Sequence, residues 1–172
     1  MDVQRVIVAF GGNLDSVWGS PRETFNRAAI RMAENGVIWQ GFSPLYRTAP
    51  IPAGAQPWFL NAVAVGESAL APHDLLAALL ALEDEAGRVR QRRNEARPLD
   101  LDLIDHGGRR IGQPGDRLTL PHPRLHERAF VLRPLADLLP DWRHPAGGQT
   151  IASLLTAPAV AAQQIEWLSA DW

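Results

Sequence analysis

The chain has 172 residues, a net charge of -2 and no cysteine, and all 17 of its basic residues are arginine. This length predicts one domain, residues 1–172, whose core needs no disulfide or structural metal. The composition excludes thiolate nucleophiles, cysteine-based zinc sites, phosphate-loop lysines and a strongly basic surface for nucleic acid, and no apolar run approaches the ~20 residues of a membrane span or resembles a secretory signal. We therefore expect a cytoplasmic protein.

The hydrophobic pattern predicts a strand over 3–12 that ends in glycines, followed by a helix. Ser20 as N-cap, Pro21 at the first helical position and Glu23 in a capping box mark the start of this helix, and Gly36 marks its end. A second strand is expected over 37–48 and a third over 59–67, with a loop rich in proline and glycine over 49–57 between them.

A second helix is expected over 72–87, because leucines at 75, 76, 79 and 82 define one apolar face. An aspartate-containing strand over 99–104 follows and turns at residues 106–108. The order β-α-β-β-α-β is typical of an α+β, ferredoxin-like core with a mainly antiparallel sheet and helices packed on it. A C-terminal extension adds expected helices over 126–140 and 150–158.

The aspartate strand contains the main chemical signal. Asp100 and Asp102 alternate with leucines, so both carboxylates project from one face about 7 Å apart, while the leucines face a core. Carboxylates this close repel each other unless a cation lies between them. Magnesium bridging these carboxylates to phosphate oxygens is one interpretation, and an exposed strand whose aspartates pair with arginines is the other.

Three further segments support a phosphate or ring-binding site. Arginines crowd the residues before the aspartates, where they form a solvated basic turn, a nucleic-acid contact or a bidentate phosphate site. A second basic segment, interrupted by two prolines, contains Arg117, His122, Arg124, His126 and Arg128. In the third segment, Phe59 and Asn61 could stack on a flat heterocycle and read its edge, although a core and turn role explains most of that segment.

The motifs "YRTAP", "QPWFLNAVAV", "LEDEAGRVR", "ARPLDLDLI" and "LTLPHPRLHERAFVLRPL" occur in this order along the chain. Together they resemble the 2-amino-4-hydroxy-6-hydroxymethyldihydropteridine pyrophosphokinases of folate biosynthesis. The resemblance runs to about Leu139. It implies transfer of pyrophosphate from ATP to the hydroxymethyl group of 6-hydroxymethyl-7,8-dihydropterin, with release of AMP, by a monomer that uses no nucleic acid or membrane partner.

The resemblance also implies roles for individual residues. Asp100 and Asp102 would ligate two magnesium ions, and Arg88 and Arg97 would stabilise the phosphates during transfer. The residues implied in ATP binding are Glu83, Arg90, Arg117, Thr119, His122 and Arg128. The residues implied in pterin binding are Thr48, Ala49, Ile51, Phe59, Asn61 and Phe130.

The sequence departs from the family pattern near the expected site. Gly12 replaces a serine in the first glycine motif, Asn94 and Pro98 replace a tryptophan and a threonine before the aspartates, and Ala49 replaces a proline. These departures leave the aspartates and Arg97 intact, so they bear on loop geometry and not on the reaction.

Two alternative functions remain open from the residues. A ferredoxin-like RNA-binding module would need aromatic side chains on its central strands, and the strands 3–12 and 99–104 provide one phenylalanine and two acids. A magnesium-dependent kinase of another small alcohol would use the same aspartates. AMP as the product, in place of ADP, would distinguish the pyrophosphokinase from such a kinase.

Overall fold

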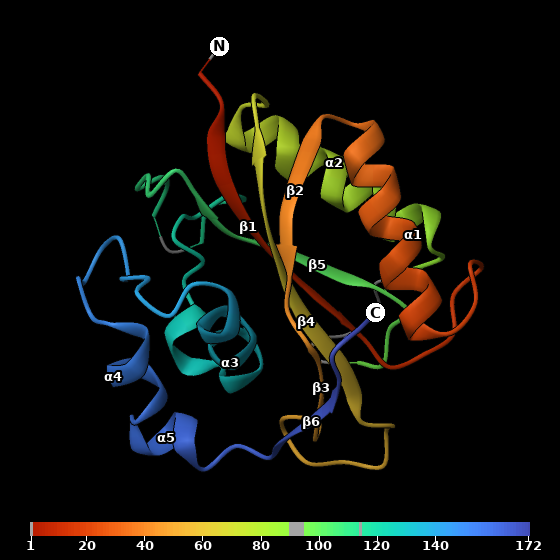
Figure 1. Cartoon of the computed structure of the whole chain (residues 1–172). Helices are drawn as coiled ribbons and strands as arrows, with labels where there is room; N and C mark the ends of the chain where they lie inside the picture. Colours follow the sequence, from red (N-terminus) through yellow and green to blue (C-terminus); the bar gives the residue numbers. More distant parts are fainter. Residues whose placement is uncertain (1, 90–94, 114) are drawn as a thin grey trace.

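A computed structural model describes residues 2–89, 95–113 and 115–172 (Figure 1). The first part of the chain forms β1 (Gln4–Gly12), α1 (Pro21–Glu34), β2 (Val37–Phe42), β3 (Leu45–Thr48), β4 (Phe59–Ser68), α2 (Pro72–Glu85) and β5 (Asp100–His106). The remainder forms a 3-10 turn (Leu125–Glu127), α3 (Ala129–Leu138), α4 (Ile151–Leu155), α5 (Pro158–Ala161) and β6 (Ile165–Ser169).

The strands form one sheet in the order β5-β1-β4-β3-β6, with β2 also paired to β4. Every pairing between these strands is antiparallel. Helices α1 and α2 cover one face of the sheet, and α3, α4 and α5 lie on the other side (Figure 1). The α+β, ferredoxin-like expectation is therefore confirmed.

The prediction of one strand over 37–48 is wrong in one respect, because this segment forms two strands, β2 and β3. The break falls at Ser43 and Pro44, and proline has no backbone N–H to continue a ladder. Ser43 donates its N–H to the carbonyl of Val63 at 2.9 Å, and its hydroxyl accepts the N–H of Val63 at 2.9 Å. Both halves therefore remain paired with β4 although the strand is interrupted.

The predicted start and end of α1 are confirmed. Ser20 and Glu23 form the reciprocal capping box, with Pro21 in the first turn. Gly36 follows the helix with φ +94°, a conformation that glycine adopts without steric cost. The helix is thus defined at both ends by local sequence.

Alternation along the central strands creates two separate cores. On β1, Val6, Val8 and Phe10 face α1 and α2, whereas Ile7 and Ala9 face α3. On β5 and just before it, the core under α1 and α2 takes three buried leucines, Leu99, Leu101 and Leu103. The alternating aspartates are therefore turned toward the α3 side, as the sequence pattern predicts.

The C-terminal region differs most from expectation. Helix α3 begins at Ala129, and residues 125–127 before it form the 3-10 turn, so the expected helix over 126–140 starts too early. The strand β6 is not anticipated by the sequence pattern. It joins the sheet at the outer edge of β3, where Ile165 pairs with Thr48 and Trp167 pairs with Tyr46.

Trp172 completes the core beneath this added strand. Its indole ring lies 4.8 Å from the ring centroids of both Phe10 and Phe42, and its Nε1 donates to the carbonyl of Ser43 at 2.8 Å. Because the ring is half-buried, we expect Trp172→Ala to lower the free energy of unfolding by about 2 kcal/mol. Thermal denaturation should show a fall in Tm of roughly 4–8 °C.

Trp167→Ala is the matched control, because that side chain is 61% exposed on β6. We expect it to cost less than about 0.5 kcal/mol. Equal losses in the two variants would contradict the packing role of Trp172.

Asp105 gives a prediction about stability and pH. Its carboxyl is fully buried, one oxygen accepts the N–H of Gly108 at 3.1 Å, and the other has no hydrogen bond within the described residues. Burial raises the pKa of Asp105 despite the opposing effect of Arg5, so the ionised form costs stability at pH 7 and that cost disappears as pH falls below the unfolded-state pKa.

We therefore expect Asp105→Asn to raise the Tm at pH 7 and to leave it unchanged near pH 3. Asparagine keeps the acceptor for Gly108 and carries no charge at either pH. Calorimetry at the two pH values tests this expectation, and a stabilisation that is independent of pH would contradict it.

Candidate active site

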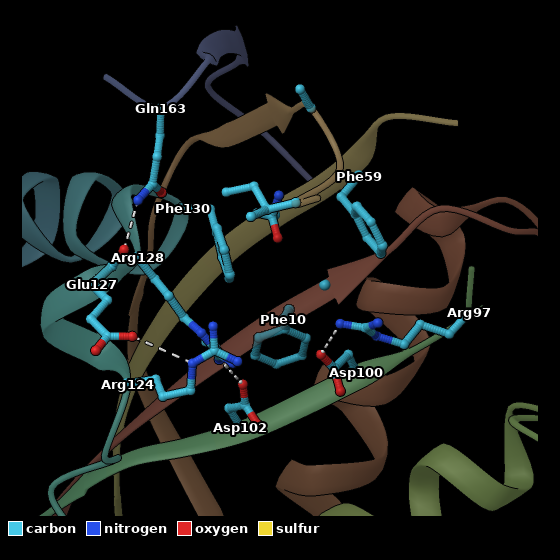
Figure 2. Close-up of a pocket in the computed structure, with 15 residues that line it drawn as sticks. Phe10, Phe59, Arg97, Asp100, Asp102, Arg124, Glu127, Arg128, Phe130 and Gln163 are labelled. Carbon is cyan, nitrogen blue, oxygen red and sulfur yellow. Dashed lines mark hydrogen bonds and ion pairs between the residues drawn. The ribbon is translucent and has the colours of Figure 1, made fainter. Parts of the chain in front are cut away.

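Asp100 and Asp102 lie on β5 at the floor of a cavity on the α3 side of the sheet (Figure 2). On the neighbouring strand β1, Asp100 is paired with Gly11 and Asp102 with Ala9. Because these two partners have little or no side chain, the space beside the carboxylates stays open. The sequence thus places small residues where the sheet must leave room for a ligand.

Arginines neutralise both carboxylates. Asp100 accepts from Arg88 Nη1 at 2.6 Å through one oxygen and from Arg97 Nη2 at 2.7 Å through the other. Asp102 accepts from Arg128 Nη1 at 3.0 Å. Burial raises the pKa of Asp100, but the guanidinium groups of Arg97 and Arg88 outweigh it and hold the pKa below its usual range. The ion-pair interpretation therefore describes the ligand-free site.

Glu83, on α2, connects Arg88 to β5. Its carboxylate, on a residue only 1% exposed, accepts the backbone N–H of Leu101 at 2.7 Å and lies 2.7 Å from Arg88 Nη1. Arg88 is thus held between Glu83 and Asp100. This geometry makes Glu83 a positioning residue for Arg88, and a direct contact of Glu83 with ATP stays a prediction.

Two aromatic rings enclose the other end of the cavity. Phe59 from β4 and Phe130 from α3 project into it from opposite sides (Figure 2). Asn61, which is 4% exposed, also lines it, and its Nδ2 donates to Thr48 Oγ1 at 2.7 Å. That bond fixes the orientation of the Asn61 amide. Thr48 therefore acts on the cavity indirectly, by orienting Asn61. We call this space between the two phenylalanines the ring slot.

Ala49 and Ile51 complete the lining of the ring slot from the loop that follows β3. Five of the six residues expected to bind the pterin therefore line one cavity with the aspartates. They come from the loop after β3, from β4 and from α3, so only the tertiary structure brings them together.

The same arginines contact both the carboxylates and the rings. Arg97, which pairs with Asp100, lies 5.0 Å from the centroid of the Phe59 ring. Arg128, which pairs with Asp102, lies 5.5 Å from the centroid of Phe130. These distances allow cation–π contacts. Each ring of the slot is thus linked through one guanidinium to one aspartate.

A second groove runs along the outer edge of β5, on the other side of the aspartates. It is lined by α2, β5 and the segment before the 3-10 turn. Four residues expected to bind ATP contribute to it: Glu83, Arg117, Thr119 and His122. The fifth, Arg128, lines the ring-slot cavity instead, and Arg90 lies outside the described residues.

His122 is held in one tautomer between these elements. Its Nδ1 accepts the backbone N–H of Arg124 at 3.2 Å, and its Nε2 lies 3.8 Å from Asp102 Oδ1. Burial lowers the pKa of His122 and outweighs the raising effect of Asp102, so the ring is neutral at pH 7 with its proton on Nε2. That N–H can be donated to an oxygen atom near Asp102.

Sequence reasoning missed several residues that shape the site. Asn13 connects the end of β1 to the segment before β5, because its backbone N–H donates to the carbonyl of Arg97 and its Oδ1 accepts the N–H of Arg97, both at 2.9 Å. Its Nδ2 also donates to the carbonyl of Pro57 at 2.9 Å. The "GGN" motif was its signal. Glu127 and Gln163 also line the cavity without having been expected there, whereas Arg124 belongs to the second basic segment named from the sequence.

Two of the departures from the family pattern are in contact. An ideal Cβ built at Gly12 would lie 2.5 Å from the carbonyl oxygen of Pro98, which is closer than real Cβ contacts come. The backbone at Pro98 therefore occupies space that a serine at position 12 would need. The two changes are thus mutually compatible.

The donor set fits magnesium that is shared with phosphate. The described residues contain no cluster of three or more His, Cys, Asp or Glu side chains that could hold a metal by themselves. Magnesium usually takes one or two carboxylates and completes its shell with substrate phosphates and water. Within the described residues, the buried Arg97 Nε has no hydrogen-bond partner, and this leaves a donor for a phosphate oxygen.

This arrangement, an arginine-rich carboxylate pair beside a ring slot on a ferredoxin-like sheet, defines a phosphoryl-transfer protein for a flat heterocyclic substrate. A family model described as 7,8-dihydro-6-hydroxymethylpterin-pyrophosphokinase (HPPK) matches residues 7–140. The chain belongs to this family.

Named relatives agree with the family. The 2-amino-4-hydroxy-6-hydroxymethyldihydropteridine pyrophosphokinase of Pseudomonas aeruginosa is 44% identical over 158 residues, which cover 90% of this chain and 92% of the relative. The Synechocystis enzyme of the same name is 37% identical, with 87% of this chain and 73% of the relative covered. A mitochondrial folate synthesis bifunctional protein of Arabidopsis thaliana is 42% identical, and this chain spans 23% of its length.

A solved structure supports the fold. The crystal structure of Plasmodium falciparum HPPK-DHPS A437G with pteroate superposes with a TM-score of 0.66 at 13% identity, covering 89% of this chain and 42% of that one. At this identity the similarity concerns the fold alone. Within the described residues, no helix has the length and apolar character that crossing a membrane requires.

Proposed function

We infer that this chain transfers the pyrophosphoryl group of ATP to the hydroxymethyl group of 6-hydroxymethyl-7,8-dihydropterin and releases AMP. The observation that carries this inference is the single cavity in which Phe59, Phe130 and Asn61 lie beside the arginine-paired Asp100 and Asp102. The family and the names of the relatives support the same reaction. The same observations favour this reaction over RNA binding and over phosphorylation of another small alcohol.

The pterin is proposed to stack between Phe59 and Phe130. A flat ring there gains apolar contact on both faces. Asn61, oriented by Thr48, can hydrogen-bond the edge of the ring, and Ala49 and Ile51 close the slot. The hydroxymethyl group would then point toward the aspartates, where the reaction takes place.

ATP is proposed to bind in the groove along β5, near Arg117, Thr119 and His122. Asp100 and Asp102 would hold two magnesium ions shared with the phosphates. Bound there, magnesium supplies positive charge that neutralises the phosphates as they approach the carboxylates. Arg90, outside the described residues, remains part of this proposal.

The arginines are proposed to exchange partners when the substrates bind. Arg88, Arg97 and Arg128 pair with the carboxylates in the ligand-free site. Guanidinium groups bind phosphate oxygens as well as carboxylate oxygens, so they can move from carboxylate to phosphate over a short distance. During transfer, the pterin hydroxyl oxygen bonds to the β-phosphorus, the bond from that phosphorus to the α-phosphate oxygen breaks as AMP leaves, and the hydroxyl proton passes to water.

No side chain forms a covalent bond with the substrates in this scheme. Positioning of the hydroxyl in line with the leaving AMP, and stabilisation of charge on the transferred group, provide the acceleration. A monomeric, cytoplasmic enzyme that needs no nucleic acid or membrane remains part of the proposal. The lack of cysteine is compatible with a reducing compartment.

Product identity tests the proposed function. Purified protein is incubated with magnesium, ATP and 6-hydroxymethyl-7,8-dihydropterin, and the nucleotides are separated by anion-exchange chromatography. We expect equal amounts of AMP and pterin diphosphate. ADP as the product would indicate a simple kinase, and lack of turnover would refute the proposed reaction.

A further inference from the structure

We propose that Gln163 is a positioning residue for the ring slot, because its side-chain amide holds the first turn of α3 and thereby sets the place of Phe130. The inference rests on the proposed function, since it assigns the ring slot to the pterin. Gln163 lies in the C-terminal region, 28 residues after the last of the recognised motifs ends at Leu135. It nevertheless lines the same cavity as the aspartates.

The amide of Gln163 uses both of its polar atoms on α3 and its surroundings. Its Oε1 accepts the backbone N–H of Ala129 at 2.9 Å. Its Nε2 donates to the carbonyl of Glu127 at 2.6 Å and to that of Ala159 at 3.1 Å. Figure 2 shows the side chain extending to the backbone of Glu127 beside Arg128. The side chain thus joins the turn before α3, the start of α3 and α5.

Helix α3 needs this support because it has no side-chain cap of its own. The N-cap residue is Arg128, whose side chain makes no capping hydrogen bond. Its guanidinium reaches Asp102 instead. The first N–H groups of a helix have no partner within the helix, and an acceptor at this position stabilises the first turn. Gln163 supplies that acceptor from a distant part of the chain.

The capped N–H belongs to Ala129, the residue between the two functional side chains. Arg128 precedes it and pairs with Asp102, and Phe130 follows it and forms one wall of the ring slot. A shift of this turn would therefore move the phenyl ring against the pterin face. Arg128 has a second restraint in its ion pair, whereas the backbone at Phe130 depends on the turn itself.

Strand β6 anchors the segment that carries Gln163. Two residues later, Ile165 pairs with Thr48, the residue that orients Asn61. Glu166 then forms an ion pair with Arg47 at 2.7 Å. The C-terminal segment is therefore attached to β3, near one wall of the ring slot, while Gln163 holds the opposite wall. The C-terminal segment is thereby proposed to set the distance between the two walls of the ring slot.

The test compares Gln163→Ala and Gln163→Met with the matched control Gln164→Ala. Methionine keeps an unbranched chain of similar length and removes all three hydrogen bonds. The Gln164 side chain is exposed, so its truncation changes the segment without touching α3. Calorimetry measures the Kd of the pterin with a non-hydrolysable ATP analogue and magnesium present, and the Kd of the analogue alone. Circular dichroism measures the Tm of each variant.

We expect both Gln163 variants to bind the pterin about tenfold more weakly, with nucleotide affinity changed less than about twofold. Gln164→Ala should match the wild-type protein in both affinities. Wild-type pterin affinity in Gln163→Met, whether or not its Tm falls, would overturn the positioning role. A wild-type protein that produces AMP with the pterin while Gln163→Met binds normally would refute this inference alone, whereas a wild-type protein without turnover would refute the proposed function.

Discussion

Asp102→Ala is expected to lower kcat at least about a thousandfold, which corresponds to ~4 kcal/mol of transition-state stabilisation. The substitution removes one of the two carboxylates proposed to hold magnesium, and it leaves Arg128 without its partner. Asp100→Ala is expected to have an effect of the same size. Both are measured as AMP formation at saturating magnesium, ATP and pterin.

Asp105→Asn is the matched control on the same strand, because its side chain is buried outside the cavity. We expect it to keep wild-type turnover. Asp102→Asn adds a variant that preserves shape and loses only the charge, and we expect it to be as inactive as the alanine variant. Near-normal activity in either Asp102 variant would remove this residue from the site.

The structure changes what we expect for the stability of Asp100→Ala. From the sequence, loss of one carboxylate should relieve repulsion and leave the fold as stable or more so. The ligand-free protein instead pairs Asp100 with Arg88 and Arg97. With its pKa lowered, Asp100 contributes stability above the unfolded-state pKa, and that contribution is lost as pH falls. Asp100→Ala should therefore lower the Tm at pH 7 and do so less near pH 3.

Arg97→Ala is expected to lower kcat about a hundredfold to a thousandfold while raising the KM for ATP less than about fivefold. Its guanidinium lies between Asp100 and the Phe59 ring, beside the place proposed for the transferred group. Single-turnover measurements separate the chemical step from binding. Loss of nucleotide affinity with an unchanged transfer rate would make Arg97 a residue for ground-state binding.

Arg88→Ala is a less direct test of the chemical step than Arg97→Ala. Its side chain, 13% exposed, lies between Glu83 and Asp100, so Arg88→Ala removes the cation that these two carboxylates share. We expect a loss of stability along with the loss of rate. Arg97→Ala is the cleaner kinetic test for this reason, and Arg109→Ala, with its exposed side chain beyond β5, is the control that should leave both parameters unchanged.

Local features of this protein follow directly from the order of its residues. Capping residues and glycines set the ends of α1, and alternation placed the two aspartates on one face of β5, because a strand's periodicity is a local property. The motifs also identified the family. The break at Ser43 and Pro44 was not predicted, although Pro44 is a local signal for it. Both halves of the segment still pair with β4.

The partners of these residues depend on the packing of the whole chain. Nothing in the sequence pairs Arg128 with Asp102, caps α3 with Gln163 or adds β6 to the edge of β3. These contacts join residues far apart in the chain, and their energies depend on distance and burial, which no local pattern encodes. The charge on the aspartates was therefore predictable from the sequence, whereas its neutralisation by three arginines depended on how the sheet, its loops and α3 pack together.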